Sequence, residues 1–148
     1  MDPYVIFETG HWAVSHRQDS RYPGYLIVTS RDGQSDLHQL NADTLSELGF
    51  VLKDSEVLVR AVFSPLKVII AKFGFSGGSG CHFHVAPVTA ALLAEISAHR
   101  DYADEPDGND AMLFLSRIYC ERRLSLVERN ELMGTISTLR EAAKLRAP

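Results

Sequence analysis

The chain has little cysteine and no long apolar run. Its two cysteines, Cys81 and Cys120, form no Cys-x-x-Cys pair, so the sequence indicates neither a disulfide framework nor a cysteine-based zinc site. No stretch approaches the roughly 20 apolar residues that span a bilayer. The first residues carry Glu8 and are interrupted by other polar residues, which predicts a strand rather than a secretory leader. We therefore expect no membrane partner and a reducing, cytoplasmic location with free thiols.

Basic residues are also few and scattered. Lys and Arg total 15 against 19 Asp and Glu, which gives a formal net charge of -4. A general nucleic-acid binder needs an extended positive surface, so we do not expect that class of partner, although a local positive pocket stays compatible with the sequence. The 148 residues, 45% of them hydrophobic, fit one globular domain with an ordinary core.

The front half of the chain predicts strands. Residues 4–9, 12–16 and 25–30 are rich in apolar and β-branched side chains. Gly10-His11 separates the first two segments, which is typical of a tight hairpin. A polar stretch ending in Pro23-Gly24, a turn signal, precedes the third segment.

The spacing of the apolar residues changes after Asn41. Leucine and valine then recur every three or four residues, which predicts a long helix over residues 43–63, with Asn41 or Asp43 as its cap and Pro65 beyond its end. Residues 66–73 and 81–87 predict two more strands. The rest predicts helices over residues 88–100, 110–123 and 125–146, and Ser125 with Glu128 fits a capping box.

The segment FGFSGGSGCHFHVAPV, residues 73–88, carries the clearest functional signal. Side chains alternate along a strand, so His82 and His84 share one face with the small residues Gly80 and Ala86. The opposite face carries Cys81, Phe83 and Val85, which we expect in the core. Small residues beside two imidazoles leave room for a ligand.

Three interpretations of this histidine pair are open. Both side chains could simply lie on a half-exposed strand. A zinc site is the second interpretation, but it needs a third ligand, and no recognisable spacing supplies one. The third is nucleophilic attack on a phosphorus ester, since histidine has an unperturbed pKa of about 6.5 and is largely neutral near pH 7. The backbone amides of Gly77, Gly78, Ser79 and Gly80 could then hold the phosphate oxygens.

The chain resembles the histidine-triad (HIT) superfamily of nucleotidyl hydrolases and transferases. The family motif is His-x-His-x-His followed by two apolar residues and often proline. The segment GCHFHVAP, residues 80–87, aligns with it when Gly80 takes the first place, His82 the middle place and His84 the third. The resemblance extends to PGYLIVTSR, SDLHQLNADTLSELG and KVIIAKF, so it covers about residues 4–90.

This resemblance implies an α+β fold, in which a HIT-like five-stranded antiparallel sheet is crossed by the helix at residues 43–63 and followed by a C-terminal helical extension. We expect a HIT-like domain over residues 1–90 and an extension over residues 91–148 that packs on the same domain. The resemblance also implies a homodimer.

The resemblance further implies a hydrolase or transferase, similar to diadenosine polyphosphate or nucleoside phosphoramidate hydrolases. Its substrate would be a nucleotide-like phosphoester, phosphoanhydride or phosphoramidate. His82 would attack the α-phosphorus and form a covalent phospho-histidine, while His84 would donate to the same phosphate or position the ring. This chemistry requires no metal and no cofactor. The alternative is a catalytically eroded nucleotide- or anion-binding module on the same scaffold.

Several positions depart from the family pattern. Gly80 lacks the first imidazole, although its carbonyl could still orient the His82 ring. Tyr25 stands where several branches have a further histidine. Arg17, beside His16, stands where some branches have an aspartate for the ribose hydroxyls; arginine cannot accept hydrogen bonds from a diol but can bind a phosphate. Besides the loop residues, the expected substrate contacts are Tyr25, Arg17, His16 and Lys72.

Overall fold

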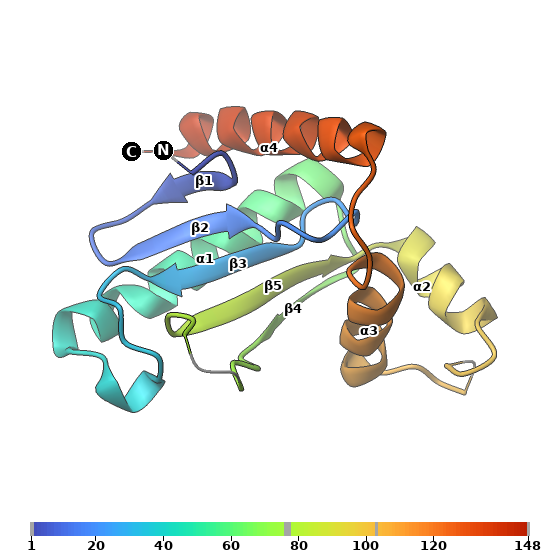
Figure 1. The fold of residues 1–148 in the computed structure, drawn as a ribbon, viewed down its shortest axis with the longest axis horizontal. Helices are drawn as coiled ribbons and strands as arrows, with labels where there is room; N and C mark the ends of the chain where they lie inside the picture. The colour runs from blue at the N-terminus through green and yellow to red at the C-terminus, as the bar shows by residue number, and fades with distance from the viewer. Residues whose placement is uncertain (1, 76–77, 103, 148) are drawn as a thin grey trace.

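Five antiparallel strands form one sheet in the computed structural model, which describes residues 2–75, 78–102 and 104–147 (Figure 1). The strands are β1 (Val5–Glu8), β2 (Trp12–His16), β3 (Leu26–Ser30), β4 (Lys67–Ala71) and β5 (His82–Val88). They lie in the order β1-β2-β3-β5-β4. The predicted α+β fold with a five-stranded antiparallel sheet is therefore confirmed, and the predicted strands differ from the observed ones only at their ends.

The register between β3 and β5 positions the histidine pair. Thr29 pairs with His82 and Ile27 pairs with His84. On the other side of β5, Ala71 of β4 also pairs with His84. Residues directly opposite each other in a sheet share a face, so the two histidines lie among short or apolar neighbours. The expected adjacency of the third strand and the histidine strand is confirmed.

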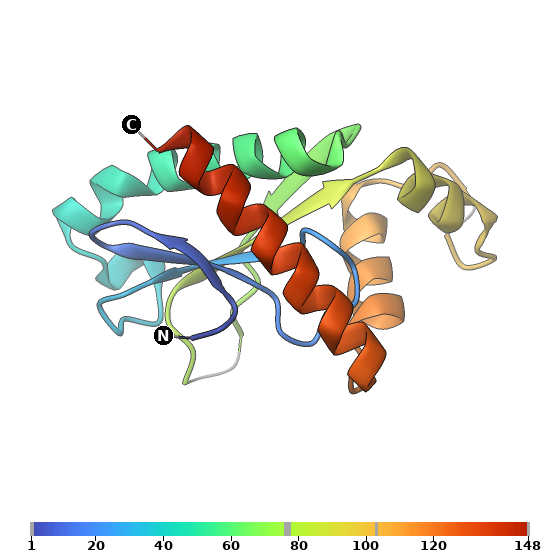
Figure 2. The ribbon, with the colours of Figure 1, turned by 90° about the horizontal axis from the view of Figure 1, so that it is seen from above.

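One face of the sheet packs against α1 (Ala42–Phe63), while α4 (Leu126–Arg146) lies along β1 and against α1 (Figures 1 and 2). The helix α1 begins after Asn41, whose side chain accepts a hydrogen bond from the Thr44 N–H, and it ends at Ser64, which has a φ of 47°. Buried side chains from the sheet and both helices form a first hydrophobic cluster, which includes Trp12, Val14, Leu26, Val28, Val51, Leu58, Val85, Leu132, Ile136 and Leu139.

The opposite face of the sheet is partly covered by the segment between β5 and α4. This segment contains α2 (Ala90–Ala98), α3 (Gly108–Phe114) and a π-helical turn, η2 (Leu115–Tyr119). Its apolar side chains form a second hydrophobic cluster with residues from the sheet and the preceding turn, including Tyr22, Tyr25, Ala86, Leu92, Ile96, Met112, Leu115 and Cys120. Ala86 shares its face with the two histidines, so this segment covers one end of the histidine-bearing face.

Two predicted helix boundaries were wrong. The helix expected from Val88 begins at Ala90, because Val88 still belongs to β5 and the Thr89 side chain caps the helix by accepting from the Leu92 N–H. The helix expected over residues 110–123 begins at Gly108, where Asp107 is the cap, and becomes η2 after Phe114. The predicted capping box at the start of α4 is confirmed.

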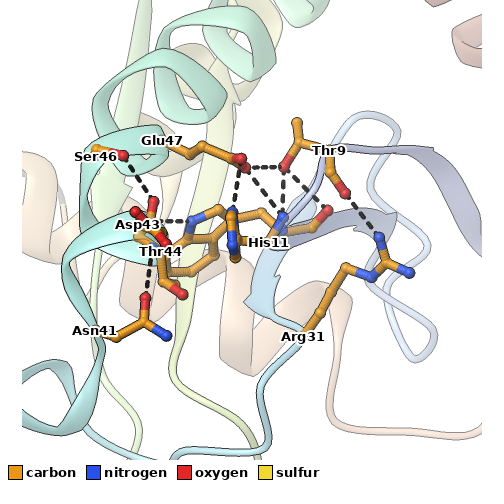
Figure 3. A network of polar contacts seen from close by, with 9 residues as sticks. Thr9, His11, Arg31, Asn41, Asp43, Thr44, Ser46 and Glu47 are labelled. Atoms are coloured by element: carbon orange, nitrogen blue, oxygen red, sulfur yellow. Dashed lines mark hydrogen bonds and ion pairs between the residues drawn. The ribbon is translucent and has the colours of Figure 1, made fainter.

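A polar network ties the β1–β2 hairpin to α1 (Figure 3). The Glu47 carboxylate accepts from the Thr9 hydroxyl at 2.7 Å and from the His11 backbone N–H at 3.1 Å, and it lies 2.7 Å from His11 Nδ1. Arg31 donates to the Thr9 carbonyl at 2.7 Å. The hydrogen bonds from Thr9 and His11 lower the pKa of Glu47, so this carboxylate stays ionised and holds the sheet on the helix.

Within the described residues, every helix is either too short or too polar to cross a membrane.

Candidate functional site

His82 and His84 lie side by side on β5, with ring centroids 5.2 Å apart, and both are half-buried. On the opposite face Cys81 and Val85 are fully buried, and Phe83 packs against the first hydrophobic cluster. The predicted division of β5 into a histidine face and a core face is confirmed.

The His82 ring is oriented by the backbone of Gly80. Its Nδ1 lies 2.9 Å from the Gly80 carbonyl oxygen. A carbonyl can only accept, so the ring proton of a neutral His82 belongs on Nδ1 and Nε2 keeps its lone pair. Within the described part of the chain, Nε2 makes no hydrogen bond. The Gly80 carbonyl therefore leaves Nε2 as the unprotonated nitrogen of a neutral His82 ring.

A small open pocket of about 90 Å³ lies beside His82. Its lining residues are Ser35, Asp36, Gly74, Phe75, Ser79, Gly80 and His82. Two of the expected loop residues, Ser79 and Gly80, therefore face the same pocket as the imidazole. Gly78 lies in the adjoining turn with a φ of 94°, a conformation that favours glycine, and Gly77 lies outside the described residues.

The pocket wall also carries a negative charge that the sequence did not predict. Asp36 belongs to the lining, and its carboxylate lies 3.9 Å from the Lys72 ammonium group. Lys72, which the sequence predicted as a phosphate contact, thus lies next to the pocket wall through its ion pair with Asp36. Residues 35–49 resemble the family, but their spacing marks no single residue as a pocket residue.

His84 belongs to a chain of hydrogen bonds that runs away from the pocket. The Tyr25 hydroxyl lies 2.8 Å from His84 Nδ1, and Arg17 Nη1 donates to that hydroxyl at 3.1 Å. Arg17 Nε in turn donates to the Asp19 carboxylate at 2.6 Å. The structure thus places Tyr25 and Arg17 beside His84, but Tyr25 is only 1% exposed, so it contacts the imidazole instead of serving as the substrate contact that the sequence predicted. Asp19 was missed because no motif marks it.

Burial and neighbouring charges keep His84 neutral. Desolvation, followed by the charges of His82 and Arg17, lowers the pKa of His84 to about 4. Burial also raises the pKa of Tyr25, so its hydroxyl stays protonated. At neutral pH the pair therefore consists of an uncharged imidazole and a phenol that still has a proton to donate.

His16 lies in the interior instead of facing the pocket. Its Nε2 accepts from the Gly24 N–H at 2.9 Å and its Nδ1 lies 2.9 Å from the Arg17 carbonyl oxygen. Nε2 thus holds the Pro23-Gly24 turn, and Nδ1 is used by the backbone of the neighbouring Arg17. Burial lowers the pKa of His16 to about 4. A side chain at Gly24 would meet the Phe63 ring at 2.5 Å, so this turn requires glycine.

A metal site and a reactive cysteine are less well supported by the structure than the histidine pair. Within residues 2–75, 78–102 and 104–147, no three histidine, cysteine, aspartate or glutamate side chains gather as metal ligands. Cys81 and Cys120 are buried free thiols, and burial raises the pKa of each. A raised thiol pKa lowers the thiolate fraction, which makes both cysteines poor nucleophiles.

No protein-family model matches the sequence, and no curated protein matches it either. Solved structures, in contrast, match over almost the whole chain. A Hit-like protein involved in cell-cycle regulation from Bartonella henselae is 13% identical with a TM-score of 0.64, and the match covers 96% of this chain and 87% of that one. The diadenosine triphosphate hydrolase of Plasmodium falciparum is 9% identical with a TM-score of 0.67, covering 99% and 80%.

A Zn-bound histidine triad family protein from Mycobacterium smegmatis is 16% identical with a TM-score of 0.61, and the match covers 97% of this chain and 85% of that one. The chain therefore has the fold of the histidine-triad proteins, as the resemblance implied. The matched region also includes the C-terminal helices, which the sequence motifs did not cover.

Proposed function

We propose that this protein is a histidine-triad hydrolase or transferase that acts on nucleotide-like substrates, with His82 Nε2 as the nucleophile. One observation carries the proposal. The Gly80 carbonyl holds the ring proton on Nδ1, and the unprotonated Nε2 belongs to a side chain that lines a pocket with Ser79 and Gly80. The fold it shares with a diadenosine triphosphate hydrolase supports a nucleotide-like phosphoester, phosphoanhydride or phosphoramidate as the substrate.

In the proposed first step, the Nε2 lone pair of His82 attacks the α-phosphorus. A P–N bond forms as the bond from phosphorus to the leaving group breaks, and the leaving group takes the electron pair. The ring then carries a positive charge, which the Gly80 carbonyl stabilises through the Nδ1–H. The leaving group takes its proton from solvent, because Gly80 has no imidazole to supply it.

In the second step, water attacks the phosphorus and the P–N bond breaks, returning its electron pair to Nε2. The proton that water loses goes to solvent, and the product is a nucleoside monophosphate. The amides of the loop at residues 77–80 and the His84 Nε2–H would hold the phosphate oxygens. In support, Ser79 and Gly80 line the pocket with His82, and His84 shares a face of β5 with the nucleophile.

A non-enzymatic binding module on the same fold is the second candidate, and Gly80 favours it. A glycine at this position supplies no imidazole to protonate a leaving group, whereas binding of a nucleotide needs no such acid. An assay of phosphoramidates and dinucleoside polyphosphates of adenosine and guanosine separates the candidates when it is run beside thermal shifts with the same compounds. The enzyme releases a nucleoside monophosphate; the binding module is stabilised by the compounds without turnover.

We further propose that two copies pair along β4. This strand lies at one end of the sheet order, and it exposes Ile70 at 37%, with Leu66 just before it at 57%. An exposed apolar edge strand is a surface that another chain can cover. The free thiols support a reducing, cytoplasmic setting for this dimer.

Pairing along β4 can be tested by the mass of the protein in solution and by a substitution on this strand. Light scattering should give a mass twice the 16.4 kDa of one chain, and Ile70→Lys should raise the dimer dissociation constant at least ~10-fold, which is about 1.4 kcal/mol. Leu126→Lys is the matched control, because Leu126 is an exposed leucine on α4, 75% accessible. A monomeric wild-type protein at micromolar concentration, or equal weakening by both variants, would count against pairing along β4.

A further inference from the structure

We infer that Tyr25 is a positioning residue that fixes the ring proton of His84 on Nε2, and that Arg17 holds the Tyr25 hydroxyl in the donating orientation. The inference rests on the proposed function in one respect, since the Nε2–H fixed in this way is the group that would donate to a substrate phosphate. The assignment of the proton itself depends only on which groups can donate and which can accept.

The donor count settles the direction of each hydrogen bond. A guanidinium group has donors only, so the contact of 3.1 Å from Arg17 Nη1 makes the Tyr25 oxygen an acceptor. The phenol has a single proton, and its other partner is His84 Nδ1 at 2.8 Å. If Nδ1 donated instead, the proton of this hydroxyl, which belongs to a side chain only 1% exposed, would have no acceptor among the described residues, and a buried unpaired donor is costly. Tyr25 therefore donates to Nδ1. A neutral imidazole has one N–H, so that proton lies on Nε2.

Arg17 is itself held in place on several sides. Its Nε and Nη2 donate to the Asp19 carboxylate at 2.6 and 3.4 Å. Its guanidinium carbon lies 5.0 Å from the centroid of the Tyr25 ring, and its backbone N–H donates to the Tyr25 carbonyl at 2.8 Å. These contacts keep the Arg17 guanidinium in place as a donor to the Tyr25 oxygen. The phenol proton therefore stays directed at His84 Nδ1.

The segment between β5 and α4 buries this arrangement. Tyr25 is only 1% exposed and belongs to the second hydrophobic cluster with Leu115 and Cys120. Water is thus kept from replacing the phenol as the partner of His84, and an unmade hydrogen bond in such a place is costly. The low pKa of His84, about 4 and due first to burial, is consistent with a neutral ring whose Nδ1 accepts. The segment that contains η2 therefore shields the Tyr25–His84 hydrogen bond from water.

Long-range ¹H–¹⁵N NMR of the histidine rings tests the inference at pH 7.5 without any substrate. We expect His84 in the Nε2–H form. The same spectrum contains a reference of opposite type, because His16 Nε2 accepts from the Gly24 N–H and its proton therefore lies on Nδ1. Tyr25→Phe should make His84 a mixture of the two tautomers while His16 stays unchanged.

Tyr22→Phe is the matched control. Tyr22 lies in the same hydrophobic cluster, and its hydroxyl donates to the Pro87 carbonyl at 2.6 Å, so this variant also loses a buried phenol hydroxyl but leaves His84 untouched. With a cleaved substrate, Tyr25→Phe should lower kcat/KM on the order of 10-fold, as expected for a misplaced phosphate donor, and Tyr22→Phe should lower it far less.

An Nδ1–H His84 in the wild-type protein would overturn the inference, and so would a His84 tautomer that Tyr25→Phe leaves unchanged. Both of these NMR results can be obtained without a substrate, so they test the proton assignment separately from the proposed function. The expected tautomers in a protein that cleaves none of the compounds would uphold the proton assignment and overturn the proposed function alone.

Discussion

His82→Ala should lower turnover by about 10³-fold or more, as removal of a covalent nucleophile does, while the affinity for a non-hydrolysable nucleotide changes by only a few fold. The neighbouring imidazole offers no replacement, because His84 Nδ1 is occupied by the Tyr25 hydroxyl and its other nitrogen carries the proton. Binding should be retained because the variant leaves the proposed phosphate donors, the loop amides and His84, in place. Single-turnover kinetics and calorimetric titration measure the two quantities separately.

His38→Ala is the matched control for this experiment. His38 lies in the short helix η1 (Leu37–Gln39) and is exposed, so its removal changes the histidine content without changing the pocket. We expect near wild-type turnover from this variant. Wild-type turnover by His82→Ala on a substrate that the native protein cleaves would show the proposed mechanism to be wrong, however close the fold.

The second large effect is a gain of rate from Gly80→His combined with Thr29→Ser. A histidine at position 80 restores a general acid beside the leaving group, which typically contributes 10²–10⁴-fold. The change alone crowds its neighbours, because a Cβ at Gly80 would lie 3.0 Å from the Thr29 methyl carbon and 3.4 Å from the Ser30 carbonyl oxygen. Crowding of this kind costs about 1–3 kcal/mol. Thr29→Ser removes that methyl group and keeps the hydroxyl.

The measurements for this pair are kcat and the thermal midpoint of the two single variants and the double variant. Gly80→His alone should melt below the wild type, Thr29→Ser alone should keep the wild-type rate, and the double variant should recover stability and react faster. A folded double variant that binds nucleotide but gains no rate would mean that Gly80 does not occupy the place of a lost acid.

The sequence predicted the elements best where one periodic pattern decides the outcome. The alternation along β5 correctly separated His82 from the core residue Cys81, and the capping box at Ser125 correctly placed the start of α4. The same alternation along β2, where Trp12 and Val14 are buried, could also have revealed that His16 points into the core.

The contacts that define the site were harder to predict, because they join distant parts of the chain. Tyr25 and His84 are 59 positions apart, and only the β3–β5 register brings their side chains together. The pairing of Arg17 with Asp19 is local, but arginine and aspartate two residues apart are common on surfaces, so the spacing carried no signal. For the change from α3 to a π-helical turn we find no local cause.

The central claim is a covalent bond between His82 Nε2 and the α-phosphorus of the substrate. Rapid quenching in alkali followed by mass spectrometry of the intact and digested protein tests it directly, because a phosphoramidate survives base and is lost in acid. We predict a transient gain of one nucleotidyl group on the peptide that carries His82, with no gain in His82→Ala. Steady turnover with an unmodified protein at every quench time, or a nucleotidyl group on another residue, would contradict the account.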